Sequence, residues 1–342
     1  MSLPTSAFDY HLPPELIAQF PSEQRGDSRL LVVRRSGGQA VDGRFRELAS
    51  LLAPGDLLVL NTTRVRHARL LGRRASGAPA EVLLIHPSVE DTWIALGRPG
   101  SALQPGKRIE LGDGLAVETL EVLEDGLRLV RLLGGSAEAV MRRIGKLPLP
   151  PYIDRDPTPA DDLRYQTVFA TREGSVAAPT AGLHFTTELL RRLESGGVRI
   201  ACLELEVGPG TFKPVETEDP AEHPMHAERY EIPATLPAAV AAARARGAAV
   251  WAVGTTVVRA LESAARADGT LAPGTAETDL LITPGYRFRI VDRLITNFHL
   301  PRSTLLMLVA AFAGYDATMN AYAEAIRLGY RFYSYGDAMA IL

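Results

Sequence analysis

Hydrophobic positions follow two different patterns along this chain. From residue 152 onward, short apolar runs alternate with segments of helical periodicity, and helices are predicted over residues 188–194, 237–246, 256–266, 303–313 and 317–328. Apolar runs at 30–33 and 56–60 and an alternating run at 198–207 predict strands, and the unbroken run at 56–60 is typical of a strand buried on both faces. This alternation predicts an α/β domain with a mixed or mostly parallel sheet.

Residues 64–150 differ, because short β-like runs recur there at 81–85, 92–96, 107–111, 115–123 and 127–132. Gly112-Asp113-Gly114 and Glu124-Asp125-Gly126 separate the last three runs and are hairpin signals, since these residues tolerate positive φ. We therefore predict a mixed-sheet α/β main domain made of both chain ends, residues 1–62 and 152–342. A small antiparallel β-barrel domain, residues 63–151, is inserted into it.

Three stretches place a polar turn between an apolar run and a helix-like segment: residues 177–186, 250–256 and 295–304. Such a turn leaves free backbone N–H groups at a helix start, beyond the end of a strand. Three of them in one chain predict a ligand pocket assembled from strand-end loops, and hence an enzyme.

Composition narrows the class of protein. The 342 residues are 46% hydrophobic and 23% charged with a net charge of −3, so a nucleic-acid partner would have to meet a local basic patch. The one cysteine, Cys202, excludes an intramolecular disulfide and cysteine-based zinc sites. The longest apolar run, 305–313, falls short of the roughly 20 residues that span a bilayer, and no signal peptide is visible, so we expect a cytoplasmic protein without a membrane partner.

Phosphate-loop motifs are absent from the sequence. Lys213 follows Gly208-Pro209-Gly210 where a dinucleotide fingerprint needs Gly, and Arg108 follows Gly106-Lys107 where a P-loop needs Ser or Thr. Nucleoside triphosphate and NAD chemistry are therefore disfavoured.

The segment His223-Pro224-Met225-His226-Ala227-Glu228 is the best metal candidate, with His184 or His299 as a further ligand. Its spacing matches no common zinc signature and Pro224 argues against a helix. We favour a polar substrate-binding loop and predict no metal, while a metal-dependent hydrolase using His223, His226 and Glu228 stays open as an alternative.

Two histidines lie in the predicted turns. A helix N-terminus disfavours the imidazolium, so His184 is a candidate general base, although it could instead pack under Phe185. His299 is a weaker candidate, since Leu300-Pro301 can orient it in the core. In the third turn, Gly254, Thr255, Thr256 and Arg259 can hold a carboxylate or ribose hydroxyls, or they can form a plain helix cap with an exposed arginine.

Basic residues gather near both ends of the inserted module: Arg64, Arg66, Arg69, Arg73, Arg74, Arg142, Arg143 and Lys146. They could follow a phosphate backbone or form a solvated strand face. The aromatic-rich segment 330–337 could stack on a base, but such a cluster is more typical of a core.

Long motifs along nearly the whole chain resemble one known family, the S-adenosylmethionine:tRNA ribosyltransferase-isomerases of queuosine biosynthesis. They include Asp27-Ser28-Arg29-Leu30-Leu31, Ala178-Pro179-Thr180-Ala181-Gly182-Leu183-His184-Phe185-Thr186, Gly254-Thr255-Thr256-x-x-Arg259, Thr296-Asn297-Phe298-His299-Leu300-Pro301 and Arg331-Phe332-Tyr333-Ser334-Tyr335-Gly336-Asp337. Thr62 departs from the family, which often has a second Asn after Asn61.

The resemblance implies that the ribosyl part of S-adenosylmethionine moves to the aminomethyl group of a 7-deazaguanine in a tRNA anticodon loop, giving epoxyqueuosine, adenine and methionine. S-adenosylmethionine is then a consumed substrate, no cofactor is expected, and we expect a monomer. Proton-transfer candidates are His184, His299, Asp9 and Glu228.

The predicted substrate-binding residues are Thr180, Gly182, Phe185, Gly210, Thr211, His226, Gly254, Thr255, Thr256, Arg259, Asn297, Tyr335 and Asp337, and the basic residues above are predicted to contact tRNA. An RNA-binding module with a degenerate site is the second alternative.

Overall fold

The computed structural model describes residues 3–35 and 37–342, apart from the side chains of residues 125 and 212. Within these residues the larger domain is built on a nine-stranded sheet. Across the sheet the strands are β15 (Gly274–Thr278), β13 (Glu228–Ile232), β12 (Arg199–Leu205), β3 (Leu57–Asn61), β14 (Val250–Val253), β16 (Arg293–Asn297), β17 (Ala338–Ile341), β1 (Arg29–Val33) and β2 (Val41–Arg44).

The centre of the sheet is parallel. β12, β3, β14 and β16 pair in parallel, and antiparallel pairs are added towards both edges. Every residue of β3 and β14 is buried, which explains their unbroken apolar sequence. The carboxyl ends of the four parallel strands therefore meet along one edge of the sheet, where ligands bind in open α/β sheets.

Helices cover both faces of this sheet: α3 (Thr187–Ser195), α4 (Leu236–Ala245), α5 (Thr255–Ser263), α6 (Thr304–Ala313) and α7 (Tyr315–Arg327). Leu57 and Val59 of β3 point into the core cluster shared with α4, α5, α6 and α7, whereas Leu58 and Leu60 point into the cluster shared with α3. The predicted mixed α/β class is confirmed, and the five helices begin and end within a few residues of their predicted bounds. None of the described helices is long and apolar enough to cross a membrane.

The inserted module is a closed antiparallel barrel, which confirms the prediction. Around the barrel the strands are β10 (Arg128–Leu133), β7 (Thr92–Arg98), β6 (Pro79–Pro87), β5 (Arg69–Arg74), β8 (Arg108–Gly112) and β9 (Leu115–Val122). The β8–β9 hairpin turns through Asp113 and Gly114, at φ of 53° and 75°, as the Gly-Asp-Gly motif predicts. Helix α1 (Ala137–Ile144) contributes Val140 and Met141 to the barrel core.

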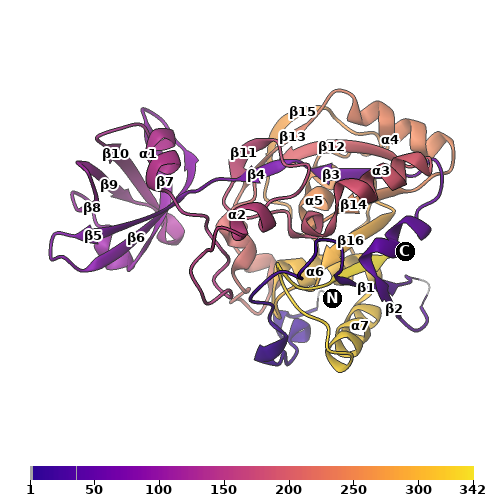
Figure 1. Cartoon of the computed structure of the whole chain (residues 1–342). Helices are drawn as coiled ribbons and strands as arrows, with labels where there is room; N and C mark the ends of the chain where they lie inside the picture. Colours follow the sequence, from indigo (N-terminus) through magenta and orange to yellow (C-terminus); the bar gives the residue numbers. More distant parts are fainter. Residues whose placement is uncertain (1–2, 36) are drawn as a thin grey trace.

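The barrel leaves the α/β domain at the carboxyl edge of the sheet (Figure 1). The chain passes from β3 into β4 (Thr63–Val65), which pairs with β11 (Arg172–Ser175) in the larger domain before the barrel begins at β5. A short helix, α2 (Asp161–Arg164), follows the return from the barrel. Because the insertion departs from a central parallel strand, it comes to lie next to the strand-end turns. The domain boundaries at 62/63 and 151/152 stay predictions.

Candidate functional site

The three strand-end turns meet around a small cavity of about 40 Å³. Residues 178–181, 254–256 and 296–300 supply most of its wall, together with Tyr152, Val207, Thr211, Leu305, Tyr333 and Ser334. The turns after β14 and β16 are held together by the bond from the Gly254 N–H to the Ile295 carbonyl, at 2.8 Å. The pattern that predicted a strand-end pocket therefore corresponds to a real convergence of the three segments.

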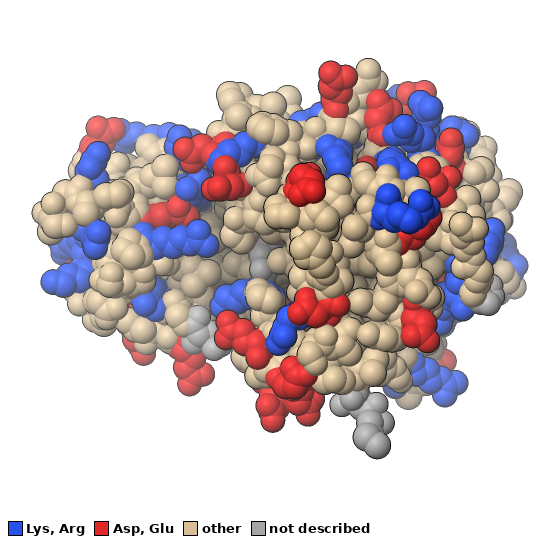
Figure 2. Space-filling view, turned by 90° about the horizontal axis from the view of Figure 1, so that it is seen from below, with Lys and Arg blue, Asp and Glu red and all other residues tan. Residues whose placement is uncertain are grey.

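Two larger cavities lie beside this one, between the domains. A cavity of about 360 Å³ shares Thr211 and Leu305 with the small one and has Ile85, Ile94 and Leu96 of the barrel as its opposite wall. A cavity of about 500 Å³ shares Leu96, Pro209 and Lys213 with the second. Seen from below, the surface between the barrel and the larger domain is hollowed (Figure 2). The three cavities thus adjoin one another through shared wall residues, and we refer to them together as the cleft, with its narrow end at the sheet.

The N-terminus of α5 opens on the narrow end. Gly254 precedes the helix at φ 95°, a backbone conformation that glycine adopts without strain, and no side chain caps the first turn. Thr255 and Thr256 follow it in the cavity wall. The hydroxyl oxygen of Thr256 is buried and has no hydrogen-bond partner among the described residues. The first turn of α5, with its free backbone N–H groups, and a threonine whose buried hydroxyl has no partner among the described residues thus form one part of the cavity wall.

Asn297 links this space to His184. Its amide nitrogen donates to the Tyr333 carbonyl at 3.0 Å and also lies 3.2 Å from His184 Nε2. Nε2 must then accept, so the ring proton sits on Nδ1, which lies 2.6 Å from the hydroxyl of Ser28. Both nitrogens of His184 are engaged, while Oδ1 of the buried Asn297 has no partner among the described residues.

Burial keeps both turn histidines neutral. It lowers the pKa of His184 to about 4; the bond from Asn297 opposes this shift, and Arg331 and Arg25 add to it. Burial also lowers the pKa of His299 to about 3. His299 Nε2 lies 2.7 Å from the Thr296 hydroxyl, and the His299 N–H donates to Tyr322 Oη at 2.9 Å. This lowered pKa agrees with the neutral His184 that we expected, but its main cause is burial and not the helix N-terminus.

Arg259 and Glu228 are each other's partners. Their side chains form a buried ion pair, and the guanidinium also donates to the Leu280 and Thr278 carbonyls, both at 3.1 Å. The second oxygen of Glu228 accepts from the Gly208 N–H at 2.9 Å. The carboxylate-binding role of Arg259 and the proton-transfer role of Glu228 stay predictions, because each group already has a strong partner within the protein.

The metal alternative depends on Glu228 as well. Among the described residues, no three His, Cys, Asp or Glu side chains gather in a way that could hold a metal ion. His226 lines the 360 Å³ cavity and packs against Gly210, where a Cβ would come within 2.8 Å of its ring. This close approach explains why position 210 needs glycine, and it fits the loop interpretation of the segment better than a zinc site.

Several predicted substrate-binding residues lie in the scaffold instead. Phe185 is fully buried against Phe45, and a Cβ on Gly182 would meet Phe169 at 2.8 Å. Tyr335 donates to Asp161 at 2.6 Å. The carboxylate of Asp337 accepts from the Arg29 and Arg331 N–H groups, both at 2.8 Å. The exposed Asp9 lines none of the three cavities. Thr180, Thr211 and the glycine–threonine turn do line the cleft.

Most of the predicted tRNA-binding cations have partners in the protein. Arg69 pairs with Glu81 and Asp156, at 2.9 and 3.3 Å, and Arg143 pairs with Asp113 at 2.5 Å. Arg64, Arg66 and Arg73 donate to the Ala170, Glu173 and Gly77 carbonyls, and a nitrogen of Arg74 is buried. Arg142 and Lys146 are exposed. Their contact with tRNA stays a prediction.

Some of the residues in the cleft carry no clear signal in the sequence. Arg98 and Lys213 line it from opposite domains, and Tyr333 and Ser334 line its narrow end. Tyr333 has φ 70°, which is uncommon for a residue with a side chain, and its carbonyl accepts from Asn297. We placed the segment 330–337 mainly in the core, and the strained turn within it shows only in the structure.

An α/β domain with a strand-end pocket, faced by an inserted barrel across a two-walled cleft, is the architecture of an enzyme acting on a small ligand. The chain belongs to the queuosine biosynthesis protein family, whose model matches residues 5–341. It is 51% identical over 337 residues to the S-adenosylmethionine:tRNA ribosyltransferase-isomerase of Pelobacter propionicus, covering 98% of each chain. It is 53% identical to the protein of the same name from Moorella thermoacetica, also with 98% of each chain covered.

A solved structure resembles the whole chain. The crystal structure of the S-adenosylmethionine tRNA ribosyltransferase from Thermotoga maritima is 40% identical, with 98% of this chain and 100% of that chain covered and a TM-score of 0.57. The fold described above is thus also the fold of a solved relative.

The two buried histidines predict a pH-dependent stability. Their pKa values lie below the ordinary value of about 6.5, so between pH 7 and pH 5 the unfolded chain binds protons that the folded chain does not. Each histidine should lower the free energy of unfolding by about 2 kcal/mol over this range. Urea unfolding at the two pH values measures the effect. His299→Asn should remove about half of the loss. A variant with the same pH dependence as the wild-type protein would contradict the argument.

Proposed function

We propose that the cleft between the barrel and the α/β domain is the site where this chain acts as an S-adenosylmethionine:tRNA ribosyltransferase-isomerase. The observation that carries this proposal is the convergence of three turns on a cavity, two of whose lining residues, Thr256 and Asn297, each hold a buried polar atom without a partner among the described residues. Buried polar groups without partners are rare in proteins and call for a ligand or ordered water. The names of the relatives support S-adenosylmethionine as that ligand.

The reaction moves the ribosyl group of S-adenosylmethionine to the aminomethyl group of 7-aminomethyl-7-deazaguanine in the tRNA anticodon. The positive sulfonium acidifies the neighbouring C5′–H, so one well-placed base can remove this proton. Nitrogen then attacks, adenine and methionine leave, and the ribose rearranges to the epoxycyclopentane of epoxyqueuosine. S-adenosylmethionine is consumed, and we propose that no further cofactor takes part.

The cleft has room for both substrates. The 360 Å³ cavity falls within the range of about 300–1,000 Å³ typical of small-molecule sites. The neighbouring 500 Å³ cavity continues from it towards the barrel and provides an approach for a nucleotide. Both walls come from one chain, so a monomer suffices, and we expect it in the cytoplasm with its tRNA.

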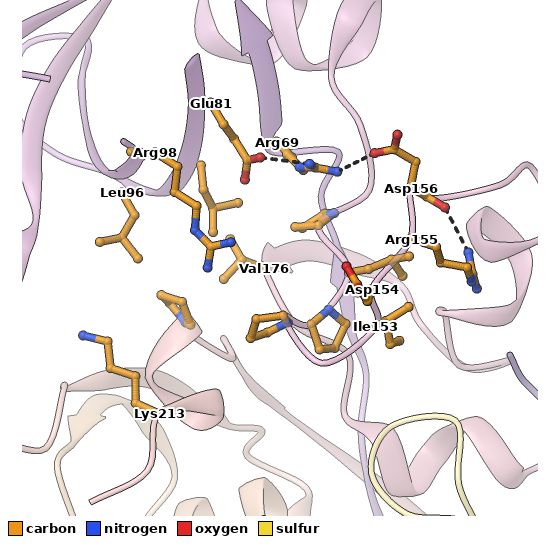
Figure 3. A pocket seen from close by; sticks show the side chains of 17 residues that line it. Arg69, Glu81, Leu96, Arg98, Ile153, Asp154, Arg155, Asp156, Val176 and Lys213 are labelled. Atoms are coloured by element: carbon orange, nitrogen blue, oxygen red, sulfur yellow. Dashed lines mark hydrogen bonds and ion pairs between the residues drawn. The ribbon is translucent and has the colours of Figure 1, made fainter. Parts of the chain in front are cut away.

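Two cations without a partner among the described residues line the side of the cleft where we propose that tRNA binds. Arg98 ends β7 on the barrel and Lys213 follows Gly210 in the larger domain; both are exposed, and their side chains point into the cleft from opposite sides (Figure 3). Arg69 and Arg155 in the same cavity are paired with Glu81, Asp156 and Asp161. Asp154 also lines this cavity and would repel a phosphate. Because Arg69 and Arg155 are already paired, attraction for a phosphate depends on Arg98 and Lys213.

The first test is the release of adenine. Purified protein mixed with S-adenosylmethionine and tRNA carrying 7-aminomethyl-7-deazaguanine should release free adenine in step with modified tRNA. Unmodified tRNA of the same sequence is the control and should release none. Binding of tRNA without any adenine would instead support the degenerate RNA-binding module. Activity that disappears with a chelator and returns with zinc would support the metal-dependent alternative.

The second test concerns the two cleft cations. Arg98→Gln and Lys213→Gln should each weaken tRNA binding and lower the slope of log affinity against log salt by about 1, because each removes one phosphate contact. Affinity for S-adenosylmethionine should not change. Arg108→Gln is the matched control, since Arg108 pairs with Glu118 on the barrel and lines neither large cavity. Unchanged slopes in both cleft variants would show that tRNA does not contact Arg98 or Lys213.

The third test concerns His184, our predicted proton-transfer group. If it transfers a proton in the reaction, His184→Gln should lower kcat by at least about 100-fold with KM for S-adenosylmethionine nearly unchanged. A rise in KM as the main effect would show that His184 acts by orienting Asn297. Ser28→Ala removes the partner of His184 Nδ1 and keeps the contact between Nε2 and Asn297. It therefore perturbs the imidazole without removing the group that orients Asn297.

A further inference from the structure

The narrow end of the cleft offers hydrogen-bond donors at one side. The first N–H groups of α5 lack intrahelical partners, no side chain caps them, and the helix dipole adds partial positive charge there. Thr256, which is 8% exposed, belongs to the same wall, and its buried hydroxyl has no partner among the described residues and can serve as a further donor. Donors at a helix N-terminus suit a small anion, and a carboxylate satisfies several of them at once.

The same cavity offers an acceptor from another turn. The orientation of the Asn297 amide is fixed, because its nitrogen must donate to the Tyr333 carbonyl. The group left facing no partner is therefore Oδ1, which can only accept, and Asn297 is 2% exposed. A ligand that satisfies this oxygen must carry a donor such as an ammonium.

Size limits the ligand group further. About 40 Å³ is the space of roughly three water molecules, too small for a nucleoside but sufficient for a carboxylate and an amine on one carbon. Thr211 and Leu305 connect this space to the 360 Å³ cavity, which can take the remainder of a longer molecule.

Arg259, the carboxylate partner that the sequence favours, is occupied. It pairs with Glu228 and with two backbone carbonyls, and it lines the larger cavity and not the small one. A substrate carboxylate next to Arg259 would have to compete with a buried glutamate already in place. The helix N-terminus carries no such competitor among the described residues.

We infer that the 40 Å³ cavity binds the α-amino-acid head of S-adenosylmethionine, with its carboxylate on the α5 N-terminus and Thr256 and its ammonium on Asn297 Oδ1. This inference rests on the proposed function. It orients the substrate: the amino acid lies against the sheet, and the sulfonium, ribose and adenine extend into the cleft towards the barrel.

The experiment compares substrates that lack one group each. Adenine release, with modified tRNA saturating, is followed for S-adenosylmethionine, for its decarboxylated form and for its desamino form. The wild-type protein should favour the complete substrate over either analogue by about tenfold or more in kcat/KM, the effect of losing hydrogen bonds to a charged group. Thr256→Val should lower kcat/KM for S-adenosylmethionine yet leave the decarboxylated substrate nearly unaffected. Thr256→Ser, which keeps the hydroxyl, is the matched control.

Different outcomes would contradict this inference and the proposed function. Equal kcat/KM for S-adenosylmethionine and its decarboxylated form in the wild-type protein would overturn the inference and leave the proposed function standing. A Thr256→Val variant that weakens both substrates equally would also overturn it, by showing that the hydroxyl meets another part of the molecule. Failure of the wild-type protein to release adenine from S-adenosylmethionine would instead refute the proposed function.

Discussion

The parallel pairing of four central strands determines where everything else in this protein lies. Because β12, β3, β14 and β16 run in one direction, the turns that follow them share one edge of the sheet. The turn after β14 leads into α5, β16 ends at Asn297 and is followed by His299, and β3 leads out to the barrel. One register therefore sets both the position of the pocket and the position of the second wall that closes it.

Hydrogen bonds around Asn297 hold the turns in place at this edge. Its amide joins the end of β16 to Tyr333 in the C-terminal segment and to His184 in the turn before α3. Ser28, at the start of β1, completes the chain of contacts through His184 Nδ1. The burial that makes this network rigid also keeps His184 neutral, and a neutral ring is required if Nε2 is to accept from Asn297. Orientation of Asn297 and the protonation state of His184 are thus one structural property.

Local patterns predicted the fold well, whereas long-range pairings decided the site. The helices and the hairpin at Asp113 follow from periodicity and turn chemistry over a few residues. The strand β5 has the sequence Arg-Leu-Leu-Gly-Arg-Arg, which in the sequence is part of a run of basic residues. Only one of its residues is fully buried in the fold, so its apolar pattern is weak. The sequence predicts that Arg259 binds substrate, but in the fold it forms an ion pair with Glu228, thirty-one positions earlier.

Long-range pairing also decides which of the basic residues can attract an anion. Arg69 is one of a run of cations in the sequence, but Glu81 and Asp156 neutralise it in the fold. Isolated residues such as Arg98 and Lys213 carry no motif, yet they line the cleft without a partner among the described residues. Charge in a sequence shows where cations are, and only the fold shows which of them stay free to attract an anion.

The two ends of the cleft are suited to different ligands. The end at the sheet is narrow and buried and has hydrogen-bond donors and an acceptor, so it can hold a small charged group with specificity. The end at the barrel is wide and carries free cations, so it suits a large polyanion that must enter and leave. A molecule with an amino acid at one end and a nucleoside at the other fits the passage between them. With the amino acid at the narrow end, as we propose, the ribose would lie in the larger cavity between the sheet and the barrel, where a nucleobase bound on the barrel side would meet it.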